Sequence, residues 1–292
     1  MEKLRLYISL IRLDKPIGIL LLLWPTLTAL WIAVEGVPDY TILTVFVLGV
    51  ILMRSAGCAI NDYADREVDS LVVRTMNRPL ATGELQPKEA LIIAAVLSVT
   101  AFSLVVLFLN TLTIMMSVVA ILLAGLYPFM KRYTYLPQVF LGAAFAWAIP
   151  MAFAAQTNAV PTVAWLLFLA NILWTTAYDT FYAMADREDD MLAEIKSTAI
   201  LFGDDDKVIV GIIQFSFLLV MVLVGTSLEM SYVFYIGIIL AALLSIYQQI
   251  LVANRDPARC LQAFINNNWV GAVLFFGVVA HYSLNIPNLV SS

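Results

Sequence analysis

The sequence predicts an all-α membrane protein, a bundle of nine transmembrane helices in a single domain over residues 1–292. The first observation is composition, since 62% of the residues are hydrophobic, 13% are charged and the mean hydropathy is +0.91. A water-soluble fold cannot hide that much apolar surface. The second observation is that the apolar residues fall into runs of about 17 to 25, the length of a helix that crosses the hydrocarbon core.

The nine expected spans are separated by short connections, apart from two long inner loops. The first span follows a basic N-terminal segment. Its length, the lack of a small-residue cleavage site and the spans that follow distinguish it from a signal peptide. Prolines fall near the starts, ends and kinks of spans, where neighbouring helices satisfy the freed backbone groups. The predicted spans are 17–34, 41–60, 88–108, 112–130, 137–155, 160–178, 208–227, 231–252 and 269–286.

The basic residues predict the orientation, because Lys and Arg in short loops stay on the cytoplasmic side. If the N-terminus is inside, the outer connections near 35–40, 109–111, 156–159 and 228–230 contain no Lys or Arg. All 16 basic residues then belong to inner segments, which predicts a cytoplasmic N-terminus and an external C-terminus. The net charge of −5 comes from acids gathered in the inner loops, so it indicates no nucleic-acid partner.

Two inner loops, after the second and sixth spans, run to about 27 and 29 residues, and loops of that length are usually functional. We expect them to fold as caps over the cytoplasmic mouth. Both begin with one acidic pattern, Asp65-Arg66-Glu67-Val68-Asp69 and, 121 positions later, Asp186-Arg187-Glu188-Asp189-Asp190. Ionisable clusters at the ends of membrane helices are functional-site candidates. Two matching clusters favour one shared site over helix caps or solvated loop charges.

The spacing within each pattern places oxygen ligands together. Steps of four put Asn61, Asp65 and Asp69 on one helical face, with Asp62 nearby. The second pattern repeats this geometry. Stacked carboxylates repel unless a cation lies between them, and Mg²⁺ is usually held by one or two carboxylates plus substrate phosphate. The predicted Mg²⁺ ligands are Asn61, Asp62, Asp65, Asp69, Asp186 and Asp190, and together they predict a diphosphate site.

A departing diphosphate also needs positive donors as its charge develops. The inner side supplies Arg66 as a predicted catalytic residue beside Asp65, Asp69, Asp186 and Asp190. The predicted substrate-binding residues are Arg78, Lys131, Arg132, Arg187, Lys196 and Tyr182, while Arg12, Lys15 and Arg54 are weaker candidates.

Several other polar residues are interpreted as structural. Asp204, Asp205 and Asp206 precede a span, where acids complement a helix N-terminus. Cys58 and Cys260 stand far apart and predict neither a disulfide nor a metal pair. His281 lies near the outer end of the ninth span, which favours a packing or interfacial role.

These motifs resemble those of the intramembrane aromatic prenyltransferases of the UbiA family. The pattern from Asn61 to Asp69, followed by Arg74-Thr75-x-x-Arg78-Pro79-Leu80, resembles the first signature of the family, and Asp186-x-x-x-Asp190 resembles the second. The resemblance covers essentially the whole chain. Segments 12–18, 178–190 and 196–203 are similar to the branch that prenylates 4-hydroxybenzoate.

The resemblance implies a ubiquinone-pathway enzyme in the bacterial inner membrane. The predicted ligands would hold Mg²⁺ and, through it, the diphosphate of a polyprenyl diphosphate whose tail lies among the helices. The ring carbon ortho to the hydroxyl of 4-hydroxybenzoate would receive the prenyl group, and apolar walls would keep water from the allylic cation.

Two alternatives stay open at this point. A sister prenyltransferase would take another aromatic acceptor, such as a naphthoate or a haem-like molecule. A cation-coupled transporter would also place acids in a helical bundle with repeats, although near the bilayer midplane, whereas here the acids lie at the ends of nearly uncharged spans.

Overall fold

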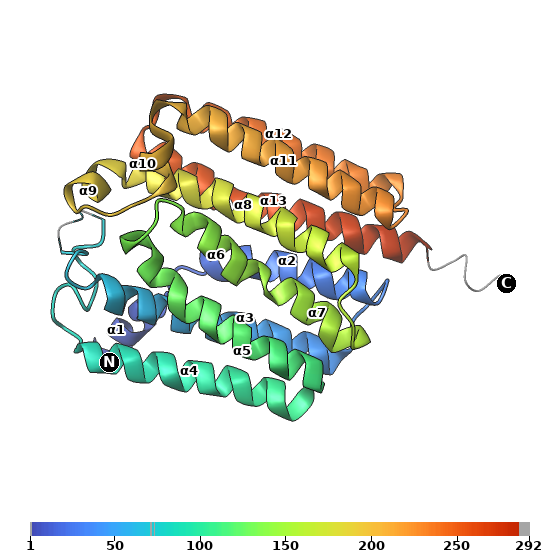
Figure 1. Cartoon of the computed structure of the whole chain (residues 1–292), viewed down its shortest axis with the longest axis horizontal. Helices are drawn as coiled ribbons and strands as arrows, with labels where there is room; N and C mark the ends of the chain where they lie inside the picture. The colour runs from blue at the N-terminus through green and yellow to red at the C-terminus, as the bar shows by residue number, and fades with distance from the viewer. Residues whose placement is uncertain (1, 71, 73, 286–292) are drawn as a thin grey trace.

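The computed structural model describes residues 2–70, 72 and 74–285, and these residues form helices joined by turns, with no strand among them. Long helices lie side by side in one bundle, as Figure 1 shows. The predicted all-helical architecture is confirmed. The last residue of the predicted ninth span, 286, lies outside the described residues.

Seven helical segments of the described chain are long and apolar enough to cross a membrane. They comprise α3 (Tyr40–Asp65), α4 (Pro87–Phe108), α5 with η1 (Thr111–Leu126 and Tyr127–Arg132), α6 with α7 (Pro137–Ala146 and Ala148–Thr157), α10 to α11 (Thr198–Phe202, η2 Gly203–Asp205 and Asp206–Ser227), α12 with η3 (Tyr232–Leu251 and Val252–Asn254) and α13 (Pro257–Asn285).

Two further helices match predicted spans without being among the seven. The apolar helix α2 (Ile17–Ala33) has 17 residues. The helix α8 (Thr162–Ala185) is 24 residues long, and its second half carries threonine, tyrosine and aspartate. Several apolar helices therefore make this a multi-pass membrane protein, while the count of nine spans stays a prediction.

Local sequence explains where several helices begin and break. Asp39 caps α3 by accepting hydrogen bonds from the backbone N–H groups of Thr41 and Ile42 at 2.8 and 3.0 Å. The helical segment at 137–157 is interrupted at Trp147. Pro150 lacks the N–H that would bond to the carbonyl of the residue four positions earlier, which explains a break just before it.

A run of three asparagines on α13 ties the second half of the bundle together. Asn266 accepts a hydrogen bond from Gln248 on α12 at 3.0 Å. Asn267 accepts one from the indole of Trp174 on α8 at 2.9 Å, and Asn268 accepts one from the indole of Trp24 on α2 at 2.8 Å. Three consecutive positions point in different directions around a helix, so this run fixes α13 against three neighbours.

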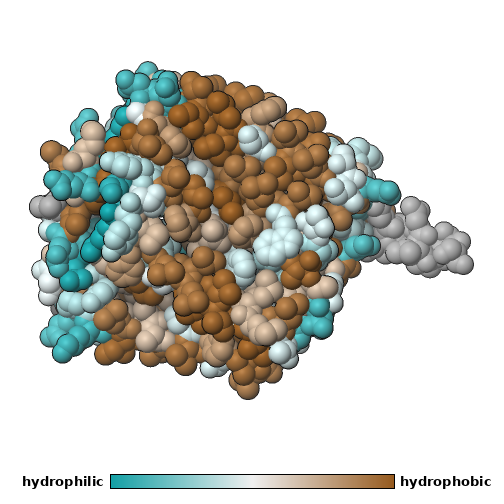
Figure 2. All heavy atoms as spheres, in the orientation of Figure 1, coloured by the Kyte–Doolittle hydropathy of each residue, from teal (hydrophilic) through white to brown (hydrophobic). Residues whose placement is uncertain are grey.

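Polar residues gather at one end of the bundle. Figure 2 shows a hydrophobic band across the middle of the visible face and hydrophilic residues over the end that holds α1 (Glu2–Leu10), α9 (Arg187–Leu192) and α10. The turns that follow α3 lie at this same end (Figure 1). Large apolar side chains remain exposed along the helices, including Leu107 and Phe215, as expected for a surface that faces lipid.

The residues interpreted as structural lie in the packed protein. Cys58 and Cys260 are free and buried. His281 is buried, and its Nδ1 accepts a hydrogen bond from the backbone N–H of Ser231 at 2.9 Å. Asp206 begins α11 at an expected place for an acid, but its side chain also makes ion pairs with two arginines.

Candidate active site

The first acidic motif forms at the polar end of α3. The helix continues five residues beyond the predicted span, so Asn61, Asp62 and Asp65 lie on its last turns. It ends at Asp65, and the backbone N–H of Asp69 bonds to the carbonyl of Asp65 at 2.8 Å. This hydrogen bond spans four residues, as in an α-helix, so Asp69 stays about one turn beyond Asp65 although α3 has ended. Asp62, Asp65 and Asp69 are only 1–5% exposed.

Three cations from separate segments of the chain hold these carboxylates. Arg12 donates from Nη2 to both oxygens of Asp62 at 2.9 and 3.0 Å. Arg78 donates from Nη1 to both oxygens of Asp69 at 2.9 and 2.8 Å and lies 3.2 Å from Asp62. Lys131, at the end of η1, pairs with Asp65. Buried carboxylates need such partners, because isolated charges are costly to desolvate.

Asn61 extends the first motif toward η1. Its amide donates to Asp65 Oδ2 at 3.1 Å, and its carbonyl oxygen lies 3.5 Å from the hydroxyl of Tyr127, which donates to it. Asp65 Oδ1 is buried and has no hydrogen-bond partner among the described residues. This carboxylate oxygen is thus shielded from bulk water and not engaged by a hydrogen bond.

The second acidic motif lies at the corner between α8 and α9. Asp186 directly follows α8 and is 8% exposed, and the backbone N–H of Asp190 bonds to the Asp186 carbonyl at 2.8 Å. The same five-residue turn therefore forms in both motifs. Arg74 donates from Nε to Asp186 Oδ1 at 2.8 Å and from Nη2 to Oδ2. The Arg74 guanidinium also lies 4.4 Å from the centre of the Tyr182 ring.

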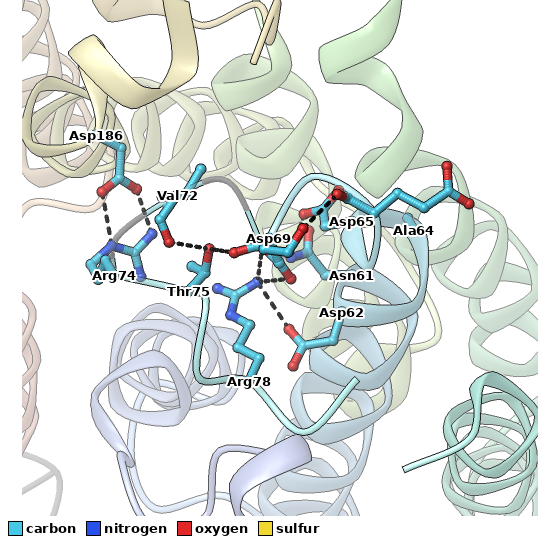
Figure 3. A network of polar contacts seen from close by, with 12 residues as sticks. Asn61, Asp62, Ala64, Asp65, Asp69, Val72, Arg74, Thr75, Arg78 and Asp186 are labelled. Atoms are coloured by element: carbon cyan, nitrogen blue, oxygen red, sulfur yellow. Dashed lines mark hydrogen bonds and ion pairs between the residues drawn. The ribbon is translucent and has the colours of Figure 1, made fainter. Parts of the chain in front are cut away.

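One short segment connects the two motifs. Arg74 and Arg78 are four residues apart, and Figure 3 shows Arg74 reaching Asp186 of the second motif while Arg78 reaches Asp69 and Asp62 of the first. Thr75, between them, donates to the carbonyl oxygen of Asp69 at 3.0 Å. The acidic clusters, 121 residues apart in sequence, thus share one polar network at the same end of the bundle.

Charge and burial shift the pKa values of groups in this network. Burial raises the pKa of Asp190 to about 7, and the neighbouring Asp186 carboxylate adds to the increase. Lys131 and Arg74 act on Asp190 in the opposite direction. Burial lowers the pKa of Arg74 and Arg78, but their carboxylate partners more than offset it, so both pKa values are raised and both side chains stay charged.

The donor set fits a hard divalent cation in its chemistry. Carboxylate and amide oxygens are the ligands Mg²⁺ prefers, and Asp65 Oδ1 is available for coordination. Within the part of the chain that the structure describes, no three His, Cys, Asp or Glu side chains are already grouped as a metal site. The carboxylates contact Arg and Lys instead, so metal binding would require some of these side chains to exchange partners.

The remaining predicted cations lie at the edge of the network. Arg66 donates to the Tyr63 carbonyl oxygen and to Glu67, both at 2.8 Å. Arg132 donates to the Ala64 carbonyl oxygen at 2.5 Å. Lys196 donates to the Tyr133 carbonyl oxygen at 3.4 Å and lies 5.5 Å from the Tyr135 ring centre. Arg187 pairs with Asp206 at 3.1 Å, away from Asp186 and its Arg74 partner.

An apolar pocket adjoins the first motif. It lies between helices α2 to α7 and contains about 1000 Å³ of empty space, counted together with its open side. Tyr127, which bonds to Asn61, forms part of its wall. Arg54 lines the same pocket, donates to Cys58 Sγ at 2.9 Å and lies 5.7 Å from the Phe145 ring centre. Its Nε is buried without a hydrogen-bond partner among the described residues.

Three of these contacts are poorly predicted by the sequence. From the sequence, Arg12 and Arg54 are weak candidates, and Arg74 appears only as part of a motif. The spacing of Arg74 and Arg78 was an available signal, because cations four residues apart near an acidic repeat are suited to bridge two clusters. For Arg12 and Arg54 no comparable signal exists, since their contacts depend on how distant segments pack.

Named relatives cover nearly the whole chain. A protein called 4-hydroxybenzoate octaprenyltransferase from Enterobacter sp. (strain 638) is 58% identical over 281 residues, 96% of this chain and 97% of the relative. Relatives of the same name from Saccharophagus degradans and Nitrosococcus oceani are 57% and 56% identical. These cover 94% and 96% of this chain and 91% and 98% of their own length.

Solved structures share the fold. The apo structure of a UbiA homolog from Aeropyrum pernix K1 matches with a TM-score of 0.77 and 22% identity, covering 89% of this chain and 97% of that one. A UbiA homolog from Archaeoglobus fulgidus bound to GPP and Mg²⁺ matches with a TM-score of 0.70 and 18% identity, covering 94% and 99%. The sequence model of the UbiA prenyltransferase family matches residues 22–278, and the chain belongs to that family.

Proposed function

We propose that this protein transfers a polyprenyl group from polyprenyl diphosphate to the ring carbon ortho to the hydroxyl of 4-hydroxybenzoate, in ubiquinone biosynthesis. The observation that carries the proposal is the network around Arg74 and Arg78, which joins both acidic motifs beside an apolar pocket. The relatives that are 56–58% identical over nearly the whole chain support the same activity.

The proposed metal is Mg²⁺, as in the Archaeoglobus fulgidus structure. Its proposed ligands come from Asn61, Asp62, Asp65, Asp69, Asp186 and Asp190. When bound, Mg²⁺ supplies positive charge to the diphosphate. The side chains that already neutralise the acids, Arg12, Arg74, Arg78 and Lys131, are placed to turn toward diphosphate oxygens. The catalytic role of Arg66 and the substrate-binding roles of Tyr182, Arg132, Arg187 and Lys196 stay predictions.

In the proposed reaction the allylic C–O bond breaks and its electron pair leaves with the diphosphate. The cationic side chains stabilise that developing charge. The ring carbon next to the phenol carbon then forms a bond to the allylic carbon, and loss of its proton restores aromaticity. The apolar pocket would hold the isoprenoid tail and exclude water that would quench the allylic cation.

Arg54 is the side chain we assign to the carboxylate of the acceptor. It is a cation in an apolar wall, and its buried Nε has no hydrogen-bond partner among the described residues. Burying a carboxylate is costly without a cationic partner, so a benzoate entering this pocket would satisfy both groups. The neighbouring Gly18 leaves room for Arg54, since a Cβ at that position would approach the Arg54 Nε to 2.5 Å.

The function is tested with purified full-length protein, a polyprenyl diphosphate, Mg²⁺ and two acceptors at equal concentration. We expect prenylation of 4-hydroxybenzoate in clear preference to a dihydroxynaphthoate. The opposite preference would favour the sister activity, and no transfer to either acceptor would overturn the proposal. Arg54→Gln should raise the KM for 4-hydroxybenzoate by about tenfold or more, because a charge-assisted hydrogen bond is lost.

The proposed topology is nine spans in one domain, capped on the cytoplasmic side by the loops after the second and sixth spans. The C-terminus would lie in the periplasm and the protein in the bacterial inner membrane. The one-sided basic residues support this orientation. Cysteines introduced at the exposed Ser70 and Ala159 test it by impermeant labelling. We expect labelling from opposite sides, and labelling from one side would contradict the topology.

A further inference from the structure

Asp206 is a buried acid outside the network described above. Its side chain is 0% exposed and contacts two arginines. Arg187 donates from Nη1 to Asp206 Oδ2 at 3.1 Å. Arg255 donates from Nη2 to Oδ1 at 2.9 Å and from Nε to both oxygens at 3.1 and 3.0 Å. Because two nitrogens of one guanidinium donate to one carboxylate, the pairing fixes the relative orientation of the two groups and also neutralises their charges.

The three residues come from three separate segments. Arg187 begins α9, Asp206 begins α11, and Arg255 lies between η3 and α13. Arg255 has a left-handed φ of 55°, which residues other than glycine rarely adopt. Its Nη2 also donates to the Asp204 carbonyl oxygen at 2.6 Å. The Arg255 backbone thus has an uncommon conformation, and its guanidinium contacts residues at the start of α11.

Arg187 connects this cluster to the second acidic motif, since it directly follows Asp186. At the corner between α8 and α9, Asp186 is held by Arg74 from one segment and Arg187 is held by Asp206 from another. Two consecutive side chains with partners on different segments restrict how the corner can rotate. The positions of Asp186 and, through the following turn, Asp190 therefore depend on both contacts.

We propose that Asp206, anchored by Arg255, is a positioning residue that holds Arg187 and thereby fixes the second acidic motif for diphosphate and metal binding. This inference rests on the proposed function for its catalytic consequence. In this proposal Arg187 holds the second motif in position through its pair with Asp206 and does not contact the substrate. It also explains why a fully buried acid with two arginine partners occurs at the start of α11, where an exposed acid would satisfy the helix end.

The first test measures the position of α9 without any activity assay. A spin label is attached to Leu192→Cys, an 85% exposed site at the end of α9, in full-length protein whose natural cysteines are buried. Arg187→Gln and Asp206→Asn should each increase the mobility of the label. Lys207→Gln is the matched control, because the Lys207 side chain donates to the Ala253 carbonyl oxygen in η3 at 2.8 Å and not to Asp206 or Arg187. The label in this control variant should have the same mobility as in the parent protein.

The second test measures the Mg²⁺ concentration that half-saturates prenyl transfer. Residues that orient metal ligands typically contribute 10- to 100-fold in affinity, so Arg187→Gln and Asp206→Asn should each raise this concentration by about tenfold. The KM for the aromatic acceptor should change by less than about twofold, because the pocket around Arg54 is untouched. The double variant should be no worse than Arg187→Gln alone, since both changes break one link.

Unchanged label mobility in both variants would overturn the inference, and so would multiplicative losses in the double variant, which indicate that Arg187 contacts substrate independently of Asp206. If Asp206→Asn fails to accumulate in membranes, Arg255→Gln replaces it. This variant leaves the buried acid one arginine partner but removes the anchor of Asp206, so it should also increase the mobility of the label. Absence of prenyl transfer by the wild-type protein would refute the proposed function alone, since the label measurement would still decide the positioning role.

Discussion

The two acidic motifs share their spacing and their turn but differ in how they are held. In the first, Asp62, Asp65 and Asp69 contact cations that come from three other segments, Arg12, Lys131 and Arg78. In the second, Asp186 contacts Arg74, and the motif's own Arg187 is anchored on Asp206. In the first motif each aspartate therefore has its own cationic partner. The second motif is a corner between two helices that is held by ion pairs on both sides.

The arginine that the two patterns have in common shows the difference most clearly. Arg66 bonds to its neighbour Glu67, which is 79% exposed, and lies 4.7 Å from the Tyr63 ring centre. Arg187 reaches a fully buried carboxylate 19 residues away. A repeated sequence pattern thus specifies a repeated turn and repeated carboxylates. The surroundings decide what the intervening arginine does.

The largest effect is expected from removing one carboxylate of either motif. Asp65→Asn and Asp186→Asn should each lower prenyl transfer by about 100-fold or more at saturating Mg²⁺, because a ligand is lost and a buried cation loses its partner. Turnover is measured in membranes containing equal amounts of each protein. Glu67→Gln is the matched control in the same repeat, because the exposed Glu67 side chain pairs with Arg66, and its turnover should stay near wild type.

Near wild-type turnover of either aspartate variant would contradict the hypothesis that the two motifs form one site. Loss in only one of them would mean that the other motif is structural.

A smaller effect is expected from the link between the motifs. Arg74→Gln should lower kcat/KM for the diphosphate by about tenfold, because Asp186 loses its two hydrogen bonds from Arg74. The losses from Arg74→Gln and Asp186→Asn should not add, as is usual for residues in contact. Lys88→Gln, which changes an exposed cation at the start of α4, is the control and should have little effect. Fully additive losses would show that Arg74 acts independently of Asp186.

The sequence was sufficient to predict the elements that depend on local pattern. Apolar runs gave helices close to the predicted bounds, as α4 at Pro87–Phe108 shows against a predicted span of 88–108. The step-four spacing placed Asn61 and Asp65 on one helix. The predicted single helical face was wrong beyond that point, because α3 ends at Asp65 and α8 ends at Ala185. Asp69 is positioned by the turns that follow α3, and Asp190 lies on the separate helix α9.

The partners of the acids could not be predicted, because they depend on packing. Arg12 is 50 residues from Asp62 and Arg74 is 112 residues from Asp186. The positive-inside rule explains each of these cations equally well as an orientation signal, so composition cannot distinguish a ligand-binding arginine from a topological one. Asp206 was interpreted as an acid at a helix N-terminus for the same reason. Its burial and its two arginine partners are tertiary features.

The arginine comparison itself predicts a still smaller effect. Arg66→Gln should lower prenyl transfer by about threefold, since an exposed pair such as Arg66 with Glu67 contributes little, whereas Arg187→Gln should raise the Mg²⁺ requirement by about tenfold. Both are measured in one assay as a function of Mg²⁺. A loss for Arg66→Gln as large as for Asp65→Asn would instead give Arg66 the catalytic role that the sequence predicts.

The smallest effect concerns Asp190 in the absence of metal. Burial and Asp186 raise its pKa to about 7 in the folded protein, above the value of 3.8 that an unperturbed side chain has. The folded state then binds a proton more tightly than the unfolded state, so the stabilisation from this proton is complete below about pH 4 and is lost as pH rises through about 7. With a chelator present, wild-type protein should lose thermal stability between about pH 4 and 7 relative to Asp190→Asn, which cannot ionise. Each kcal/mol should correspond to a shift of about 2–4 °C in Tm. Parallel pH profiles for the two proteins would show that Asp190 is not perturbed and that the second motif is as well neutralised as the first.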